Sequence, residues 1–134
     1  MGNPQPLEVA MDFIKRINSG DVTALCELMT EGHIFQDALG KRSIGRETMR
    51  QGWTMYFKMV ADYQVHADEF FQTDDRLAIF GTASGRCMGG GAAHENFWEV
   101  PAAWRATVQG GLIAEWRVYA DNQPLRELMG DRVP

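Results

Sequence analysis

The sequence predicts an α+β protein in which three N-terminal helices pack on one face of a strongly curved antiparallel sheet. In the first part of the chain, apolar side chains recur at helical spacing, whereas from residue 62 onward long extended segments alternate with turn residues. Helices followed by a run of strands are typical of α+β proteins. A curved sheet covered by helices on one side would enclose a cone, so we also expect an internal pocket.

The helices are predicted from their apolar spacing and from the residues that end them. The first covers residues 7–17 and stops at the Asn-Ser-Gly turn that follows, and Asp21 is placed to cap the second. A strand follows within the segment 33–40, HIFQDALG. The third helix begins near Gly45 and carries its large apolar side chains on one side.

The extended segments are bounded by turn residues. The hairpin turn between the first two is predicted at Asp74-Asp75, and a Gln-Gly-Gly turn leads into the last strand, LIAEWRVYAD. A short terminal helix follows the last strand. The predicted strands cover 63–72, 76–88, about 93–108 and 112–121, and the helix covers 125–129.

Length and composition exclude several classes of protein. The 134 residues fit one domain, and 45% hydrophobic with 23% charged residues is ordinary for a globular protein. The net charge of −5, without a basic stripe, argues against a nucleic-acid partner. No apolar run approaches roughly 18 residues and no secretory leader is seen, so we expect a cytoplasmic protein without membrane contact. Cys26 and Cys87 are expected to be reduced and buried.

The segment 33–40 contains the acid on which the functional prediction depends. Read as a strand, it places His33, Phe35 and Asp37 on one face. Asp37 is therefore either a solvated acid at a strand end or a carboxylate directed into an apolar pocket. In a pocket it could carry protons.

Four segments, FIKRINSGD, HIFQDALG, GRETMRQGW and GLIAEWRVYADNQPLREL, occur in an order that resembles the nuclear-transport-factor-2-like superfamily, in particular its SnoaL-like and ketosteroid-isomerase-like group. The resemblance extends from about Leu7 to Met129. It implies a cystatin-like α+β barrel, a cone with a deep apolar pocket, and a homodimer. We accordingly expect a single SnoaL-like domain over residues 1–134.

The resemblance implies a catalytic acid at Asp37. QDALG matches the E-D-P-V-G strand whose Asp shuttles the proton in ketosteroid isomerases, with Ala38 in place of Pro. Those enzymes also use a Tyr and a protonated Asp as hydrogen-bond donors to the substrate oxygen. The corresponding positions are Phe13 and Ala103, which have no donor. Because losing one such donor typically costs about 10²–10³ in rate, the ketosteroid isomerase mechanism is not expected.

A second candidate acid, Asp121, ends the last strand. WRVYAD resembles the W-R-x-Y-F-D ending of epoxide hydrolases and the late Asp of SnoaL-type cyclases, which implies an active carboxylate, although Asp121 could instead cap the terminal helix. The Arg and Asp that the hydrolases need correspond to His94 and Asn96, which could orient a ligand or water. The limonene-type epoxide hydrolase mechanism is therefore not expected. His94 is either a further catalytic residue or an ordinary polar strand residue.

Several aromatic residues are candidates for contacting the substrate. Trp53 and Tyr56 lie on the helix that walls the pocket in this superfamily, and are otherwise core residues. Because the side chains of a strand alternate between its two faces, Trp116 lies on the opposite face from Tyr119 and Asp121. Either Trp116 or Asp121 should therefore line the pocket, but not both. The predicted substrate-binding residues are Phe13, Trp53, Tyr56, Asn96, Trp98, Trp116 and Tyr119.

These patterns favour a cofactor-independent enzyme acting on a small apolar molecule. The expected reaction is an isomerisation, a hydrolysis or hydration, or a cyclisation, with Asp37 or Asp121 transferring a proton. No cofactor is expected, and the three histidines have no metal-binding spacing. The alternative is a non-catalytic ligand-binding or dimerisation module of the same fold.

Overall fold

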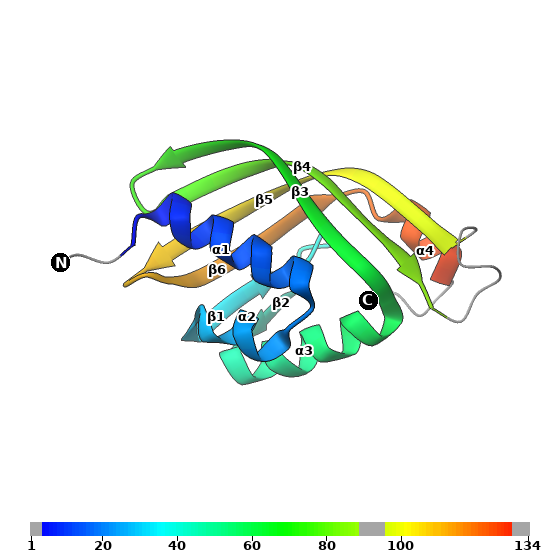
Figure 1. Ribbon diagram of the computed structural model, residues 1–134, viewed down its shortest axis with the longest axis horizontal. Coiled ribbons are helices and arrows are strands. Elements are labelled where there is room, and N and C mark those ends of the chain that lie inside the picture. The colour runs from blue at the N-terminus through cyan, green and yellow to red at the C-terminus, as the bar shows by residue number, and fades with distance from the viewer. Residues whose placement is uncertain (1–3, 89–95, 130–134) are drawn as a thin grey trace.

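One curled sheet, which does not close, forms the framework of the structure (Figure 1). The computed structural model describes residues 4–88 and 96–129. Within them, six strands lie in the order β2-β1-β6-β5-β4-β3. Their bounds are β1 (Met29–Gln36), β2 (Arg42–Ile44), β3 (Val60–Thr73), β4 (Arg76–Cys87), β5 (Phe97–Gln109) and β6 (Leu112–Ala120).

The helices pack on this sheet as the sequence predicts, so the α+β class is confirmed. In the described part of the chain they are α1 (Pro6–Ser19), α2 (Val22–Glu27), α3 (Arg46–Met59) and the short terminal α4 (Gln123–Met129). α1 ends at Gly20, whose φ of 72° suits a residue without a side chain. The Asp21 side chain accepts a hydrogen bond from the Ala24 N–H at 3.1 Å, so the predicted cap of α2 is present.

The sheet is mixed, whereas the sequence predicts an antiparallel one. β3 to β6 pair in antiparallel fashion, but β1 runs parallel to β6 and antiparallel to β2. β2 occupies a short segment before α3 in which the sequence predicts no strand. β1 and β6 lie far apart in the sequence, and no local sequence pattern predicts that two such segments pair in parallel.

β3 carries two bulges that change which side chains face the core. Its register against β4 shifts between Ala61 and Gln64 and again between Ala67 and Glu69. Each shift inserts one extra residue, so inward-facing positions are three residues apart at the bulges and two apart elsewhere. The inward side chains of β3 are therefore Val60, Tyr63, Val65, Ala67 and Phe70, all buried or packed on the core.

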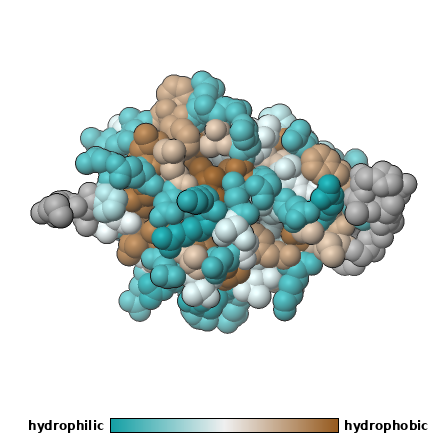
Figure 2. Space-filling model, in the orientation of Figure 1, coloured by the Kyte–Doolittle hydropathy of each residue, from teal (hydrophilic) through white to brown (hydrophobic). Residues whose placement is uncertain are grey.

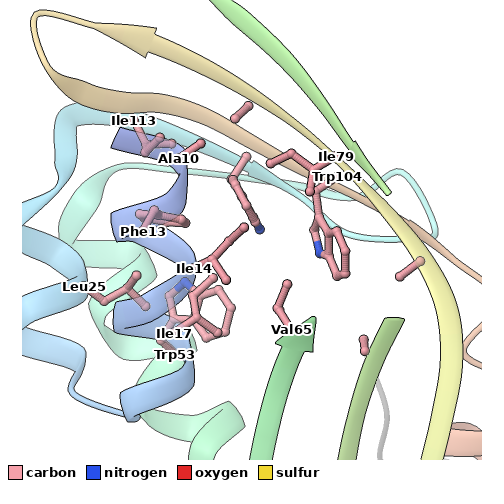
Figure 3. Close-up of a cluster of buried hydrophobic side chains, with 14 of the residues drawn as sticks. Ala10, Phe13, Ile14, Ile17, Leu25, Trp53, Val65, Ile79, Trp104 and Ile113 are labelled. Atoms are coloured by element: carbon pink, nitrogen blue, oxygen red, sulfur yellow. The ribbon is translucent and has the colours of Figure 1, made fainter. Parts of the chain in front are cut away.

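Apolar side chains fill the space between the helices and the sheet. Some also reach the surface, where Figure 2 shows hydrophobic side chains among hydrophilic ones. In the interior, Figure 3 shows the side chains of α1, including Phe13, between that helix and strands carrying Trp104 and Ile113. Trp116 lies against the Phe13 ring, with the ring centroids 4.8 Å apart.

His33 is the buried histidine of this core. Its Nδ1 lies 2.8 Å from the Ile113 carbonyl oxygen, and because that oxygen can only accept, Nδ1 carries the proton. Its Nε2 is buried and has no partner among the described residues. Burial lowers the pKa of the His33 imidazole from its ordinary value of 6.5.

None of the helices in residues 4–88 and 96–129 is long and apolar enough to cross a membrane.

Stability should fall as the pH decreases below about 6.5, the unfolded-state pKa of histidine. Because the folded pKa is lowered, the neutral ring stabilises the fold above 6.5, and the unfolded chain binds a proton first as the pH falls. The loss should reach at most about 1.4 kcal/mol per pH unit. Urea unfolding between about pH 7.5 and 5.5 measures it.

His33→Phe should flatten this pH dependence while lowering stability at neutral pH, since the Ile113 carbonyl loses its donor. His66→Gln is the control, because the His66 side chain is 76% exposed and pairs with Asp68 at the surface. An unchanged pH profile in His33→Phe would contradict the assignment.

Candidate functional site

A cavity of about 480 Å³ opens between α3, the β1–β2 turn and the inner face of the sheet. Asn122 and Leu125, at the start of α4, also line it. The described residues that line the cavity are Phe35, Asp37, Ala38, Lys41, Ser43, Thr48, Met49, Gln51, Gly52, Trp53, Tyr56, Tyr63, Ala83, Trp98, Val118, Ala120, Asn122 and Leu125.

The lining is polar at the mouth and apolar in the depth. Lys41, Thr48 and Gln51 are exposed to solvent, whereas Trp53 and Trp98 are buried. A ligand would therefore enter past polar side chains and bury its apolar part against aromatic rings, which is the usual build of a small-molecule site.

Five aromatic residues, of which Trp53 and Trp98 are buried and the other three half-buried, are named here the aromatic floor: Phe35, Trp53, Tyr56, Tyr63 and Trp98. The rings touch in sequence, with centroid distances of 6.1 Å for Phe35–Trp53, 6.0 Å for Trp53–Tyr56, 5.1 Å for Tyr56–Tyr63 and 6.1 Å for Tyr63–Trp98. Several pairs meet edge to face, the geometry that aromatic quadrupoles favour. The floor is therefore one contiguous surface.

Local features of the sequence bring these rings together. Trp53 and Tyr56 are three residues apart on α3, and so lie on one helix face. Tyr63 faces the cavity because the first bulge of β3, with Asp62 at a φ of 55°, sets it on the same side as Val60. Opposite the bulge stands Gly85, where a Cβ would meet a Val60 methyl group and lie 3.2 Å from the Trp98 ring.

The two floor tyrosines are neutral donors. Burial raises the pKa of Tyr63, and burial together with the nearby Tyr63 and Cys87 raises that of Tyr56. Both phenols therefore keep their protons across the physiological range. No other described residue forms a hydrogen bond with either hydroxyl.

Asp37 follows β1 and both closes a turn and lines the cavity. Its Oδ1 accepts hydrogen bonds from the N–H groups of Leu39 and Lys41, each at 2.9 Å. Its own N–H donates to the Lys41 carbonyl at 2.9 Å. No described residue donates to Oδ2. Asp37 is thus a half-buried residue that lines the cavity while the turn holds one of its carboxylate oxygens.

The other predicted acid lies outside the cavity. The Asp121 side chain is 82% exposed, accepts a hydrogen bond from the Gln123 N–H at 3.0 Å, and approaches Arg126 at 3.7 Å. The Asp121 carboxylate thus bonds the first N–H of α4, which is close to the capping role that the sequence offered as an alternative. Its chain neighbours Ala120 and Asn122 line the cavity instead.

The predicted binding residues divide into three groups. Trp53, Tyr56 and Trp98 line the cavity. Phe13, Trp116 and Asn96 are buried but do not line it, and Tyr119 is 46% exposed with its hydroxyl 3.4 Å from Arg117. His94 lies outside the described residues.

Tyr63 is the main lining residue that sequence reasoning missed. It lies two residues before the buried Val65 and so on the same face of the strand, which was a usable signal. The change from helix to strand and the bulge just before Tyr63 made the side-chain direction difficult to predict. Phe35 shares a face with Asp37 as the alternation predicts, and both line the cavity.

The chain belongs to the SnoaL-like domain family, which matches residues 10–116. The match runs from α1 into β6 and so contains most of the cavity. The resemblance to the SnoaL-like group of the nuclear-transport-factor-2-like superfamily is thereby confirmed. No curated protein matches the chain.

Solved structures share the fold along the whole chain. A hypothetical protein with a ketosteroid isomerase-like fold from Catenulispora acidiphila, in complex with trimethylamine, is 19% identical with a TM-score of 0.82, covering 98% of this chain and 100% of its own. A proposed SnoaL-like polyketide cyclase from Shewanella denitrificans is 14% identical with a TM-score of 0.79, covering 95% and 98%. IdmH of Streptomyces antibioticus, a proposed polyketide cyclase, is 20% identical with a TM-score of 0.75, covering 95% and 99%. At these identities, the likeness shows the fold alone.

Gly85→Ala should disturb the aromatic floor, because the new methyl group would displace Val60 and Trp98. We expect a destabilisation of about 1–3 kcal/mol, typical of overpacking, and a shifted tryptophan emission. Urea unfolding and fluorescence spectra measure both. Gly32→Ala is the matched control, since its added Cβ meets nothing within 4 Å. Equal effects of the two substitutions would contradict the packing described.

Proposed function

We propose that this protein binds a mostly apolar small molecule in the cavity and uses Asp37 to transfer a proton, without a cofactor. The reaction would be an isomerisation, a hydration or hydrolysis, or a cyclisation. The observation that carries this proposal is a carboxylate at an apolar cavity, with one oxygen held by the turn and the other without a donor among the described residues. Membership of the SnoaL-like family supports it.

The turn gives Asp37 a defined direction. Two backbone N–H groups hold Oδ1, so the carboxylate needs little reorganisation to meet a substrate. Oδ2 can take a proton from a carbon or a water molecule and return it elsewhere on the same ligand. Two of the structural neighbours are proposed polyketide cyclases, which is consistent with such chemistry.

Asp121 and His94 remain predictions as further catalytic groups. The exposed, helix-capping position of Asp121 favours Asp37 as the proton carrier. A role for Asp121 would require its exposed side chain to turn toward the cavity, which its neighbours Ala120 and Asn122 line.

A non-catalytic ligand-binding function is the second candidate. It is favoured by the structural role of Asp37 in its turn, which alone could explain an acid at that position. The Catenulispora acidiphila neighbour was solved in complex with a small molecule, trimethylamine.

Proton transfer can be tested without knowing the substrate. In D₂O, the protein should catalyse hydrogen–deuterium exchange at the α-carbon of some members of a panel of ketones and enones, followed by NMR. Asp37→Asn should slow this exchange by about 10²–10⁴-fold, the usual contribution of a general base. The amide oxygen of Asn can still accept both turn hydrogen bonds, so the fold should be kept.

Asp74→Asn is the control, because Asp74 lies in the exposed β3–β4 turn with a φ of 55° that Asn tolerates. A loss of exchange in Asp121→Asn, but not in Asp37→Asn, would assign the base to Asp121. Exchange at the wild-type rate in both variants would assign the base to neither acid, and no exchange above background in the wild type would favour the non-catalytic function.

We also propose that the protein is a homodimer through the outer face of the sheet. Phe80, Ala103 and Tyr119 pair across β4, β5 and β6 and lie on the opposite face from the buried Trp104. Phe80 and Phe71 are exposed yet pack edge to face at 5.9 Å. Such a row of exposed aromatic side chains is typical of a covered surface.

Sedimentation at micromolar concentration should therefore give twice the 15.1 kDa mass of the chain. Phe80→Glu should shift the protein toward the monomer, because two charges would face each other across a twofold axis. Met11→Glu, on an exposed position of α1, is the control. A wild-type protein that sediments only as a monomer would refute the dimer.

A further inference from the structure

β5 lies in the middle part of the outer face, between β4 and β6 (Figure 1). Because the side chains of a strand alternate, its buried residues, such as Trp104, point to the core and the others point outward. The row therefore carries an acid three residues before Ala102 and a base three residues after it. The outward side chains are, in chain order, Phe97, Glu99, Pro101, Ala103, Arg105 and Thr107.

The base of this row, Arg105, is a half-buried cation that lacks an acid beside it. In the register of the sheet it lies opposite Ala78 on one side and opposite Arg117 on the other. Glu115 on β6 pairs with Arg117 at 3.2 Å and with Arg42 at 3.8 Å, and no described residue pairs with the Arg105 guanidinium. Because like charges directly opposite each other destabilise a sheet, an acid supplied from outside would stabilise this place.

The acid of the row, Glu99, is exposed and also lacks an ion pair. It lies opposite Ser84 on β4, and β6 has already ended at Ala120. Arg86, two residues further along β4, is bonded to Asp62 at 2.8 Å. No described residue pairs with the Glu99 carboxylate. The strand therefore presents one unpaired acid and one unpaired base toward the same side.

A dimer that brings two outer faces together has its twofold axis in the plane between the sheets. If the axis runs along β5, each residue lies over its own copy, so two Glu99 side chains meet and two Arg105 side chains meet. If the axis runs across β5, the two copies of the strand are antiparallel, and residues at equal distances from the axis meet. Like charges that meet in an interface are strongly unfavourable, so the charges favour the axis across the strand.

We propose that two copies of this chain pair with the twofold axis across β5 near Ala102, so that Arg105 of each subunit forms an ion pair with Glu99 of the partner subunit. This proposal rests on the proposed homodimer and adds its orientation and its register. Pro101 and Ala103, which have small side chains, lie between the two ion pairs and let the sheets approach.

The distances suit such a pairing. The six residues from Glu99 to Arg105 span about 20 Å of strand, so each ion pair lies about 10 Å from the axis. Packed sheets cross at about 30°, which displaces the facing strands by about 5 Å at that point. The long Arg105 side chain can cover this displacement. Arg117, which lies beside Arg105, adds a second positive charge close to the incoming carboxylate.

Charge reversal tests the pairing. Glu99→Arg and Arg105→Glu should each raise the dissociation constant of the dimer by about 100-fold or more, because two attractions become two repulsions. A mixture of the two variants should form a heterodimer, in which every facing pair again has opposite charges. The double variant Glu99→Arg, Arg105→Glu should form a homodimer like the wild type. Sedimentation measures the dissociation constants, and native mass spectrometry identifies the heterodimer by its mass.

Glu27→Arg and Lys58→Glu are the matched controls. They make the same changes of charge at exposed helical positions, at the ends of α2 and α3. Both should dimerise like the wild type. Recovery of the dimer in the mixture also shows that each charge-reversed variant is folded, so a loss of dimer in the single variants cannot come from unfolding.

Cysteine cross-linking gives an independent readout of the orientation. A mixture of Glu99→Cys and Arg105→Cys, treated with a short bismaleimide, should give a covalent heterodimer, whereas neither variant alone should be cross-linked. The native Cys26 and Cys87 are buried, and the wild type treated in the same way is the control. A covalent dimer of Glu99→Cys alone would place the axis along β5 and overturn the inference.

The outcomes separate this inference from the proposed dimer. A wild-type dimer that Phe80→Glu dissociates, but that both charge reversals leave intact, would refute the ion pairs and keep the dimer. Single variants that dissociate without recovery in the mixture would refute the pairing as well. So would an Arg105→Glu variant that dissociates beside a Glu99→Arg variant that does not, because another acid would then face Arg105. A monomeric wild type would refute the dimer and this orientation together.

Discussion

The cavity owes its shape to two places where β3 carries one more residue than the strand paired with it. At the first, the Asn18 side chain at the end of α1 acts like a further strand residue. Its Oδ1 accepts the Val65 N–H at 2.7 Å, and its Nδ2 donates to the Val65 carbonyl at 2.9 Å. Helix and bulged strand are thus joined by directional bonds, in addition to apolar contact.

This junction connects the fold to the site. The bulges bend β3 and turn Tyr63 inward. Opposite them, β4 carries Gly81 and Gly85, where a Cβ would collide with the His66 backbone or with Val60 and Trp98. The same constraint therefore curls the sheet and brings the tyrosine of β3 against the aromatic side chains of α3 and β5.

Electrostatics then divides the cavity into two ends. In the depth, the phenols of Tyr56 and Tyr63 stay protonated, because burial raises the pKa of each. At the mouth, the turn after β1 presents the Asp37 carboxylate, held by backbone N–H groups. A fold that hosts unrelated reactions acquires its chemistry from such a placement of a few polar atoms, so function has to be argued from the site.

The sequence by itself determined what local rules control: the α+β order, the cap at Asp21, the alternation that sets Phe35 and Asp37 on one face, and the helix face with Trp53 and Tyr56. It did not determine the β1–β6 parallel pair, the inward turn of Tyr63, or which alternative applied to Asp121. Those depend on contacts between residues far apart in the chain and on bulges that reverse the alternation. The tertiary structure decided them, because only the folded sheet sets which strand lies beside which and where an extra residue is accommodated.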